Sequence, residues 1–590
     1  MCGIFGYIGN KQNVSQMIFE GLKTLEYRGY DSWGIAIKNQ NSISIEKQTG
    51  KLPESLKSSI SNVKSNIGIG HTRWATHGGV TVKNAHPHTD CSGNIAVIHN
   101  GIVENFESLK TALIEKGHKF KSETDTEIIP HLIEEHLKNE TFTIAVKNAF
   151  NKLSGLNAIV VLNSETDEIA AAKTGSPLLA GITDTPGEYY LASDASGIIK
   201  HTKKVIFLED NQMVVLGKEL KLFQLPEGKE IKPEIHTLTW KFEEAEKGKY
   251  PHFLIKEIHE QPKVINNIAL TYSESTKQLA NLIKNAYGTF MVGCGTASYA
   301  ALAGVYLFSN IAKKHVNFSI GSEFKYLEDY IKSETLVIPI SQSGETIDVV
   351  EPVQKAKAKG AQIAAIVNVL GSTIYRLADH KFLLGAGQEK AVIATKSFMA
   401  MFSILLMTAY TMVNKQKEAT DQLIKAGEDI KKILEDTKEI KQLAKELKKK
   451  EQIYILGRGL SYATAMEASL KIKETAYVHA EGFAGGELKH GVMALIEKGT
   501  PCIVFAPNDE TYEEIISNAQ EVKARGAYVI GIGARNNDVF DKFFQTDDIK
   551  EATLLPQIAV IQLLAYYLAL EKGIKDPDKP RNLAKSVTVK

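Results

Sequence analysis

A chain of 590 residues is too long for one hydrophobic core, so we expect about three or four domains. Hydrophobic residues make up 43% of the chain and charged residues 24%, which is typical of globular proteins. The 70 Lys and Arg residues against 69 Asp and Glu residues leave no net field to hold nucleic acid or an anionic membrane, so we expect neither as a partner.

No apolar run approaches the ~20 residues that a membrane span needs, and the start lacks the basic and apolar regions of a signal peptide. The four cysteines, Cys2, Cys91, Cys294 and Cys502, lack paired spacing, which favours a reducing compartment without disulfides. These features predict a cytoplasmic, multidomain enzyme.

The second residue of the sequence is a cysteine, Cys2. A thiol needs a nearby base to become a nucleophile at neutral pH. Removal of Met1 would give Cys2 a free α-amine, which titrates at about 7.7–8.0 and lies next to its own sulfur. The alternative is an ordinary strand from Ile4 to Ile8, preceded by an inert buried cysteine.

Short strand patterns dominate the first third of the chain, with a few helical patterns between them. We expect strands at 35–37, 42–45, 95–98, 158–162, 189–192 and 213–216, and helices at 14–25, 104–116, 126–137 and 143–153. This arrangement predicts an α+β domain of packed antiparallel sheets.

Three polar clusters in this region are candidates for a binding site. Residues 70–78 combine an arginine, hydroxyls and a tryptophan in a loop bounded by glycines. His99-Asn100-Gly101 is either a hairpin turn between two apolar pairs or an oxyanion hole. In residues 122–127, Thr124 or Thr126 could cap the next helix, and Asp125 could neutralise a ligand ammonium.

His86, His88 and Cys91 resemble a metal-ligand cluster, but no fourth ligand stands at standard zinc spacing. We therefore expect no metal and no cofactor.

Together these segments resemble the class II (N-terminal-nucleophile) glutamine amidotransferase domain. The matching residues are 2–4, 27–32, 71–78, 84–88, 99–101 and 122–126. The resemblance implies an αββα fold, Cys2 as the nucleophile on glutamine, and Asn100 and Gly101 as oxyanion donors. It also implies that glutamine is bound by Arg73, Thr76, His77 and Asp125.

Proline and glycine at positions 226, 228, 233, 248, 251 and 262 punctuate a charged stretch that we interpret as a linker. Beyond it an internal repeat is visible, because residues 290–300 match residues 453–463. Each copy continues as strand, loop and helix, which predicts two α/β domains with parallel sheets.

The two copies differ in the loop where a ligand would bind. Copy one has Ser341-Gln342-Ser343-Gly344-Glu345-Thr346 before a helix, whereas copy two has residues 506–511 with Asp509 and Glu510. Hydroxyls and free N–H groups at a helix N-terminus bind phosphate, and the two carboxylates would repel it. We expect one phosphate site, in copy one; a serine-rich helix cap is the alternative. The glycine-rich segment of copy one lacks the third glycine of the dinucleotide-binding fingerprint, and the sequence contains no P-loop. Neither motif therefore supports a nucleotide site.

In copy two, Glu467, Lys471 and Glu474 share one helix face, either as a surface ion pair or as part of a site. His490 lies in a glycine-rich loop, where a structural and an acid/base role are both open. Composition alone would make the last fifteen residues a frayed tail.

The serine loop, residues 487–491 and residues 580–589 resemble the isomerizing glutamine–fructose-6-phosphate aminotransferase family, which carries two SIS (sugar isomerase) domains. The resemblance covers essentially the whole chain and implies glutamine and fructose 6-phosphate as substrates, an internal ammonia channel, a homodimer and an ordered tail. It implies sugar-phosphate contacts from Thr296, Ser341, Gln342, Ser343, Thr346 and Val392. It also implies Glu474 as the base, Lys471 as its assistant, His490 as the ring-opening group, Lys585 as a Schiff base and Trp74 as the channel gate.

Some positions depart from the family pattern: Ala297 and Ala394 stand where hydroxyls are common, and Val492-Met493 where Pro-Leu is common. Ser298 could compensate for Ala297. Two alternative functions are an amidotransferase that acts on another keto-sugar phosphate or on phosphoribosyl pyrophosphate, and a sugar-phosphate sensor with an inactive glutaminase domain. The domains expected are 1–226 (glutaminase), 227–267 (linker), 268–425 and 426–575 (SIS), and 576–590 (tail).

Overall fold

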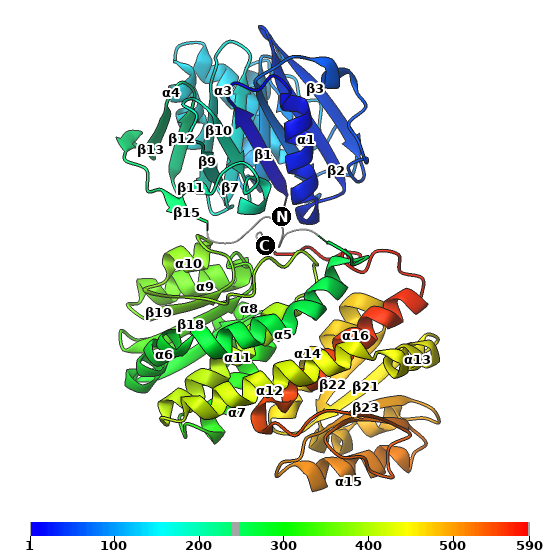
Figure 1. Ribbon diagram of the computed structural model, residues 1–590. Coiled ribbons are helices and arrows are strands. Elements are labelled where there is room, and N and C mark those ends of the chain that lie inside the picture. Colours follow the sequence, from blue (N-terminus) through cyan, green and yellow to red (C-terminus); the bar gives the residue numbers. More distant parts are fainter. Residues whose placement is uncertain (1, 239–246, 588–590) are drawn as a thin grey trace. The chain divides into compact units, whose positions relative to one another are not determined.

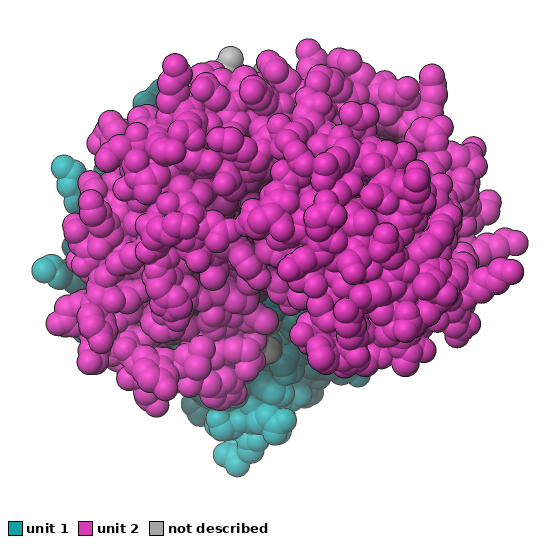
Figure 2. Space-filling view, turned by 90° about the horizontal axis from the view of Figure 1, so that it is seen from below, with its two compact units in different colours: residues 1–246, 584–590 teal, residues 247–583 magenta. Residues whose placement is uncertain are grey.

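The computed structural model describes residues 2–238 and 247–587 (Figure 1). It contains two compact units, coloured separately in Figure 2. The first unit comprises Met1–Glu246 together with Ala584–Lys590, and the second comprises Lys247–Leu583.

The first unit is built on two antiparallel sheets. The first sheet runs in the order β15 (His236–Thr237), β11 (Lys204–Phe207), β9 (Leu179–Ile182), β10 (Tyr189–Ala192), β1 (Gly3–Ile8), β4 (Ile67–Arg73), β2 (Ser32–Asn39) and β3 (Ser42–Thr49). The second runs β14 (Lys229–Ile231), β13 (Leu220–Gln224), β12 (Gln212–Leu216), β8 (Ile169–Thr174), β7 (Asn157–Asn163), β6 (Ile95–Gly101) and β5 (His88–Thr89).

Helices cover the outer faces of both sheets, so the unit has four layers. Successive residues of a strand point to opposite faces. In β1, Ile4 therefore enters the core between the sheets, while Phe5 packs with α1 (Val14–Leu25). On the other side, α3 (Ile128–Leu137) and α4 (Phe142–Phe150) pack on the second sheet, and α2 (Phe106–Glu115) lies beside α3. The αββα architecture is confirmed.

The second unit contains two five-stranded parallel sheets with one strand order. The first is β17 (Asn317–Ile320), β16 (Gly288–Gly293), β18 (Thr335–Ser341), β19 (Gln362–Val367) and β20 (His380–Leu383). The second is β22 (His479–Ala484), β21 (Gln452–Gly457), β23 (Pro501–Ala506), β24 (Tyr528–Gly533) and β25 (Lys542–Gln545). In each copy the order by chain position is 2-1-3-4-5. The predicted duplication is confirmed.

Helices surround both parallel sheets. They are α5 (Phe253–Thr271), α6 (Ser273–Asn285), α7 (Thr296–Asn310), α8 (Gly321–Phe324), α9 (Ile347–Ala358), α10 (Thr373–Leu377), α11 (Lys396–Met412), α12 (Gln416–Glu435), α13 (Lys438–Leu447), α14 (Leu460–Ala476), α15 (Tyr512–Lys523) and α16 (Leu554–Glu571). Helix α14 packs against α16 and also against α7 of the other copy. The segment Lys550–Glu571 is apolar and long enough to cross a membrane, but 89% of its 18-residue apolar window is buried, as in a core helix.

The expected linker at 227–267 is wrong in the described part of the chain. Strands β14 and β15 extend the sheets of the first unit, and α5 begins at Phe253. Helix α5 continues through Pro262 because its buried side chains recur at helical spacing, and this packing outweighs the hydrogen bond that proline removes. The expected boundary at 425/426 also falls inside α12.

The first part of the C-terminal tail is anchored in the second unit. The carboxylate of Asp578 accepts hydrogen bonds from the backbone N–H groups of Phe253 (2.8 Å) and Leu254 (2.7 Å), and so caps α5. Its main-chain oxygen accepts a bond from the N–H of Val392 at 2.9 Å. Burial raises the pKa of Asp578. These contacts explain why fraying, which composition favours, does not occur here.

Candidate active sites

Cys2 lies directly before the central strand β1, half-buried. Its Sγ accepts a hydrogen bond from the backbone N–H of Trp74 at 3.1 Å. The next residue, Gly3, donates its N–H to Thr72 Oγ1 at 3.1 Å, and a Cβ at Gly3 would lie 2.5 Å from that oxygen. Glycine is therefore required beside the cysteine so that β1 can approach β4 closely.

A cavity of about 120 Å³ opens onto this cysteine. It is lined by Cys2, Arg73, Trp74, Thr76, His86, His99, Asn100, Gly101, Thr124, Asp125, Ser176, Pro177, Ala584, Ser586 and Val587. The sequence predicted a site from residues of three separate clusters, and the structure brings all of them except His77 to this cavity. His77 contributes its main-chain oxygen, which accepts a hydrogen bond from Arg73.

Asn100 and Gly101 end strand β6 next to Cys2. Asn100 Nδ2 donates to the Cys2 carbonyl oxygen at 3.0 Å, which leaves its second N–H available to a ligand. Its Oδ1 lies 3.0 Å from His71 Nε2, and burial lowers the pKa of His71 to about 3, so a neutral imidazole orients the amide. Gly101 has a φ of 134°, which favours glycine.

The hairpin alternative for these residues is wrong. Strand β6 pairs with β7, where Asn100 faces Ala158 and Gly101 faces Asn157, instead of turning back on the residues that follow. The oxyanion-hole interpretation is therefore the one that agrees with the backbone.

Two charged groups of opposite sign border the same cavity. The guanidinium of Arg73 donates to the main-chain oxygens of Gly78 and Gly79, each at 3.3 Å, which fixes its position. Burial lowers the Arg73 pKa, while Cys2 and Asp125 act to raise it. Asp125 accepts the N–H of Val103 at 2.7 Å. This pair can bind the carboxylate and ammonium of an amino acid.

The threonines beside Asp125 act differently from the predicted helix caps. Neither makes a cap bond: Thr124 Oγ1 lies 3.0 Å from His88 Nε2, and Thr126 Oγ1 lies 2.9 Å from His99 Nδ1. These bonds belong to a buried histidine network that the sequence analysis missed. In the sequence, the only indication of this network is that histidine recurs in the motif segments.

His86 and His88 are part of that network, so they do not form a metal site with Cys91. His86 Nδ1 accepts the backbone N–H of His99 at 3.2 Å, and its ring stacks on His71 with centroids 4.2 Å apart. Burial lowers the pKa values of His86 and His88 well below their usual range, so both are neutral. His86 lines the cavity, and His88 packs beside His86.

In the second unit, the serine loop connects β18 to the start of α9. Ser341 Oγ accepts the N–H of Gly344 at 2.9 Å, and Ser343 Oγ accepts the N–H of Glu345 at 3.2 Å. Thr346 is the N-cap residue of α9 and makes no side-chain cap bond. The helix N-terminus and the neighbouring hydroxyl groups are therefore arranged to receive an anion.

The corresponding loop of the second copy is closed by its own carboxylate. Directly before α15, Asp509 Oδ1 accepts two hydrogen bonds from Thr511, one from the backbone N–H at 2.9 Å and one from the side-chain hydroxyl at 2.7 Å. A carboxylate at this helix start would repel a phosphate. This contrast supports a single phosphate site per chain, in copy one.

A buried charge cluster on α14 faces the first copy. Lys471 Nζ lies 2.8 Å from Glu474 Oε2 and 3.4 Å from Glu467 Oε1, and it donates to Thr296 Oγ1 at 2.9 Å. It also donates to the main-chain oxygen of Ala394 at 3.0 Å, a contact that needs no hydroxyl side chain. Lys471 is 1% exposed and Glu467 0%, so the surface ion-pair alternative is wrong.

The hydroxyl group that the family commonly has at position 297 is not replaced by that of Ser298. Ser298 is buried and donates its hydroxyl to the main-chain oxygen of Gly295 at 2.7 Å.

Burial of Glu467 predicts a specific pH dependence of stability. Desolvation raises its pKa from the ordinary 4.5 to about 8. Between these values the folded chain holds a proton that the unfolded chain has lost, so stability falls as pH rises through this window. Calorimetry of the full chain should show a fall in unfolding temperature between about pH 5 and about pH 8 that is smaller in Glu467→Gln. Identical pH profiles for the two proteins would contradict the buried neutral acid.

Comparison with known proteins identifies the domains in which these two candidate sites lie. A glutamine amidotransferase domain model matches residues 71–200, and a SIS domain model matches residues 282–411 and 446–567. The chain is 42% identical over 609 residues to "Glutamine--fructose-6-phosphate aminotransferase [isomerizing]" of Thermococcus kodakarensis, and 43% identical over 621 residues to the Clostridium tetani protein of that name. Each alignment covers 100% of both chains.

The chain belongs to the isomerizing glutamine–fructose-6-phosphate aminotransferase family. It is a transferase with one glutamine amidotransferase domain followed by two SIS domains. Among solved structures, it resembles the C-terminal domain of glucosamine-fructose-6-phosphate aminotransferase from Francisella tularensis. That match has 32% identity and a TM-score of 0.52, and covers 56% of this chain and 98% of that one.

Besides the serine loop and the residues around Lys471, the family resemblance assigned Val392, His490 and Lys585 to the sugar reaction. Val392 contacts the tail through its backbone, as described above. His490 is exposed at the end of a 3₁₀ helix, Gly485–His490, and has no hydrogen bond or ion pair with any residue that the structure describes. Lys585 falls within the first unit. The roles of His490 and Lys585 stay predictions.

Proposed function

We propose that this member of the aminotransferase family hydrolyses L-glutamine at Cys2 and transfers the ammonia to D-fructose 6-phosphate, which it isomerises to glucosamine 6-phosphate. The observation that carries the proposal is that Cys2 shares one cavity with Arg73, Asn100 and Asp125. The names of the full-length relatives and the phosphate-type loop of the second unit supply the acceptor.

In the glutaminase reaction, Arg73 binds the α-carboxylate of glutamine and Asp125 its α-ammonium, with Thr76 and His77 closing the site. The Cys2 thiolate attacks the side-chain amide carbon, and the second Asn100 N–H and the Gly101 N–H stabilise the oxyanion. Once Met1 is removed, the α-amine of Cys2 takes the thiol proton and returns it to the departing ammonia. Water then cleaves the thioester and releases glutamate.

In the sugar reaction, Ser341, Gln342, Ser343, Thr346 and Thr296 hold the phosphate, and Val392 lines the site. His490 opens the sugar ring, and Lys585 forms a Schiff base with the C2 carbonyl, which ammonia then displaces. Glu474, assisted by Lys471, moves a proton between C1 and C2. Trp74, whose ring packs edge-on against Tyr30 at 5.4 Å, gates the path of ammonia. We further propose that the enzyme is a cytoplasmic homodimer.

The Schiff-base role predicts that Lys585→Ala keeps glutamine hydrolysis but loses amino-sugar synthesis to below detection. The reason is that the C2 carbonyl loses its covalent partner while Cys2 is untouched. Glutamate and glucosamine 6-phosphate are measured in the same reaction. Lys575→Ala, at an exposed lysine of the same C-terminal segment, is the control and should make both products. Unchanged glucosamine 6-phosphate output by Lys585→Ala would refute the role.

The proposal is tested by incubating the full chain with glutamine and one acceptor at a time. The acceptors are fructose 6-phosphate, another keto-sugar phosphate and phosphoribosyl pyrophosphate. We expect glucosamine 6-phosphate only with the first acceptor. An aminated product from another acceptor would reassign the substrate. Absence of glutamate release under all conditions would favour a sensor with an inactive glutaminase domain.

A further inference from the structure

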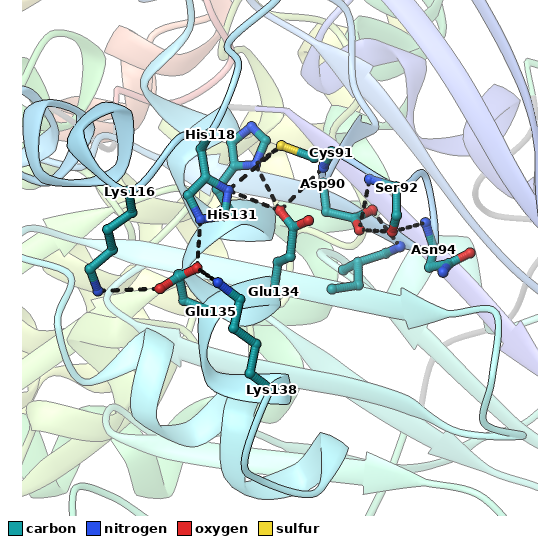
Figure 3. Close-up of polar contacts among 11 residues, drawn as sticks. Asp90, Cys91, Ser92, Asn94, Lys116, His118, His131, Glu134, Glu135 and Lys138 are labelled. Carbon is teal, nitrogen blue, oxygen red and sulfur yellow. Dashed lines mark hydrogen bonds and ion pairs between the residues drawn. The ribbon is translucent and has the colours of Figure 1, made fainter.

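Four side chains of ligand type meet in the first unit, and the glutaminase reaction uses none of them (Figure 3). Cys91 lies in the loop between β5 and β6, and His118 follows α2. His131 and Glu134 stand one turn apart on α3. Their sulfur, nitrogen and oxygen atoms all lie within 4.8 Å of one another.

Four distances within this cluster, from 3.0 to 3.6 Å, are close to those of a tetrahedral metal site. Cys91 Sγ lies 3.6 Å from His118 Nδ1 and 3.6 Å from His131 Nδ1. Glu134 Oε2 lies 3.0 Å from His118 Nδ1 and 3.3 Å from His131 Nδ1. Zinc bonds of about 2.0–2.3 Å in tetrahedral geometry place ligand atoms roughly 3.3–3.8 Å apart. A small contraction or expansion around one ion would bring all four atoms to bonding distance.

The surroundings orient one histidine for metal binding. His118 Nε2 lies 2.9 Å from Glu135 Oε1, so it donates its proton outward and directs the Nδ1 lone pair into the cluster. Glu135 is itself held by ion pairs with Lys116, at 3.3 Å, and Lys138. A histidine whose far nitrogen donates to a carboxylate is the usual support of a metal ligand.

Burial and charge also suit a bound ion. His118 and His131 are buried, and Glu134 Oε2, which lies beside both Nδ1 atoms, also accepts the Cys91 N–H at 3.2 Å. With Zn²⁺, one thiolate and one carboxylate neutralise the ion and both imidazoles stay neutral.

We propose that Cys91, His118, His131 and Glu134 bind one Zn²⁺ ion in a structural site. Sulfur, nitrogen and oxygen donors together suit zinc, and four protein ligands leave no open position for substrate. Binding displaces the thiol proton of Cys91 to solvent and involves no oxidation or reduction. The sequence-based expectation of no metal would then be wrong.

The site would connect three segments around the start of α3. The short helix that precedes α3, Asp125–Glu127, carries the proposed ammonium-binding residue, and Glu127 accepts the N–H groups of Lys121 (2.7 Å) and Ser122 (2.6 Å). An ion bound by His118 and His131 would therefore fix both ends of the segment 118–131, which contains the short helix. Its expected contribution is to the stability of the first unit.

The test is zinc content of the full chain after chelator treatment, reconstitution with zinc and gel filtration. We expect one equivalent in the wild type and in Cys2→Ala, and loss of stoichiometric zinc in Cys91→Ser and His131→Gln. Glu135→Gln should weaken zinc affinity by about 10–100-fold. His136→Gln is the control, because His136 lies on α3 but pairs with Glu140 at 3.2 Å.

Cobalt substitution gives a second readout, and its result in the wild type does not depend on the folding of any variant. Reconstituted wild type should show a thiolate-to-cobalt charge-transfer band, present in Cys2→Ala and absent in Cys91→Ser. Two results would overturn the proposal: a wild-type chain that retains no zinc, or Cys91→Ser and His131→Gln chains that retain as much as the wild type.

Discussion

Replacing Cys2 by alanine is expected to abolish glutamine hydrolysis, with a fall in rate of at least about 10⁴-fold. No other thiol of the described chain lines the cavity that holds Arg73 and Asp125, so nothing can take over the attack on the amide carbon. The serine loop and the Lys471 cluster lie in the other unit, so conversion between phosphosugars should continue in this variant.

The measurement is glutamate release from glutamine, followed together with interconversion of fructose 6-phosphate and glucose 6-phosphate. Cys502→Ala is the matched control, because Cys502 is buried in β23 of the second unit and should leave hydrolysis intact. Continued hydrolysis by Cys2→Ala would remove the nucleophile from this account.

The second large effect is expected at Glu474. Changing it to glutamine removes the proposed base while keeping the shape of the side chain, so sugar isomerisation should fall by about 10²–10⁴-fold. Glutamine hydrolysis should be unchanged. Exchange of the C1 and C2 hydrogens of fructose 6-phosphate with solvent reports the proton transfer directly.

Glu467→Gln provides a sharp comparison on the same helix. Glu467 also lies beside Lys471, but burial raises its pKa to about 8, so it is mostly protonated at neutral pH. An amide closely resembles that neutral acid, and most of the isomerisation should survive. Equal losses in Glu474→Gln and Glu467→Gln would show that the cluster acts as a structural unit and that Glu474 is not the base.

Much of the fold could be predicted from local patterns. Strand and helix patterns in the first third predicted packed antiparallel sheets, and the match between the segments that contain Gly293 and Gly457 predicted the duplicated parallel sheets. The αββα arrangement itself was implied by the family resemblance. The expected linker failed for a physical reason. Proline at position 262 indicates a break only when packing is weak, and here the buried face of α5 outweighs it.

The glutaminase site could be predicted in its residues but not in its internal order. Motif resemblance located Cys2, Arg73 and Asp125, yet it could not show that His71 orients Asn100 or that Thr126 bonds to His99. Those contacts join strands and loops that are distant in the sequence, and residue spacing carries no information about them.

The same limit applies to the proposed zinc site. Cys91, His118 and His131 come from three separate segments without a recognised ligand spacing. The sequence directed attention to His86 and His88, which are nearer to Cys91 in the chain, but their ring nitrogens are engaged elsewhere.

The central claim is that nitrogen released at Cys2 is transferred within the enzyme to the sugar. Its most direct test supplies glutamine labelled with a heavy isotope at the amide nitrogen, fructose 6-phosphate and an excess of unlabelled ammonium. The account predicts that the amino group of glucosamine 6-phosphate carries the label, with one glutamate formed for each amino sugar. Product that carries mainly unlabelled nitrogen, or glutamate released without amino sugar, would contradict it.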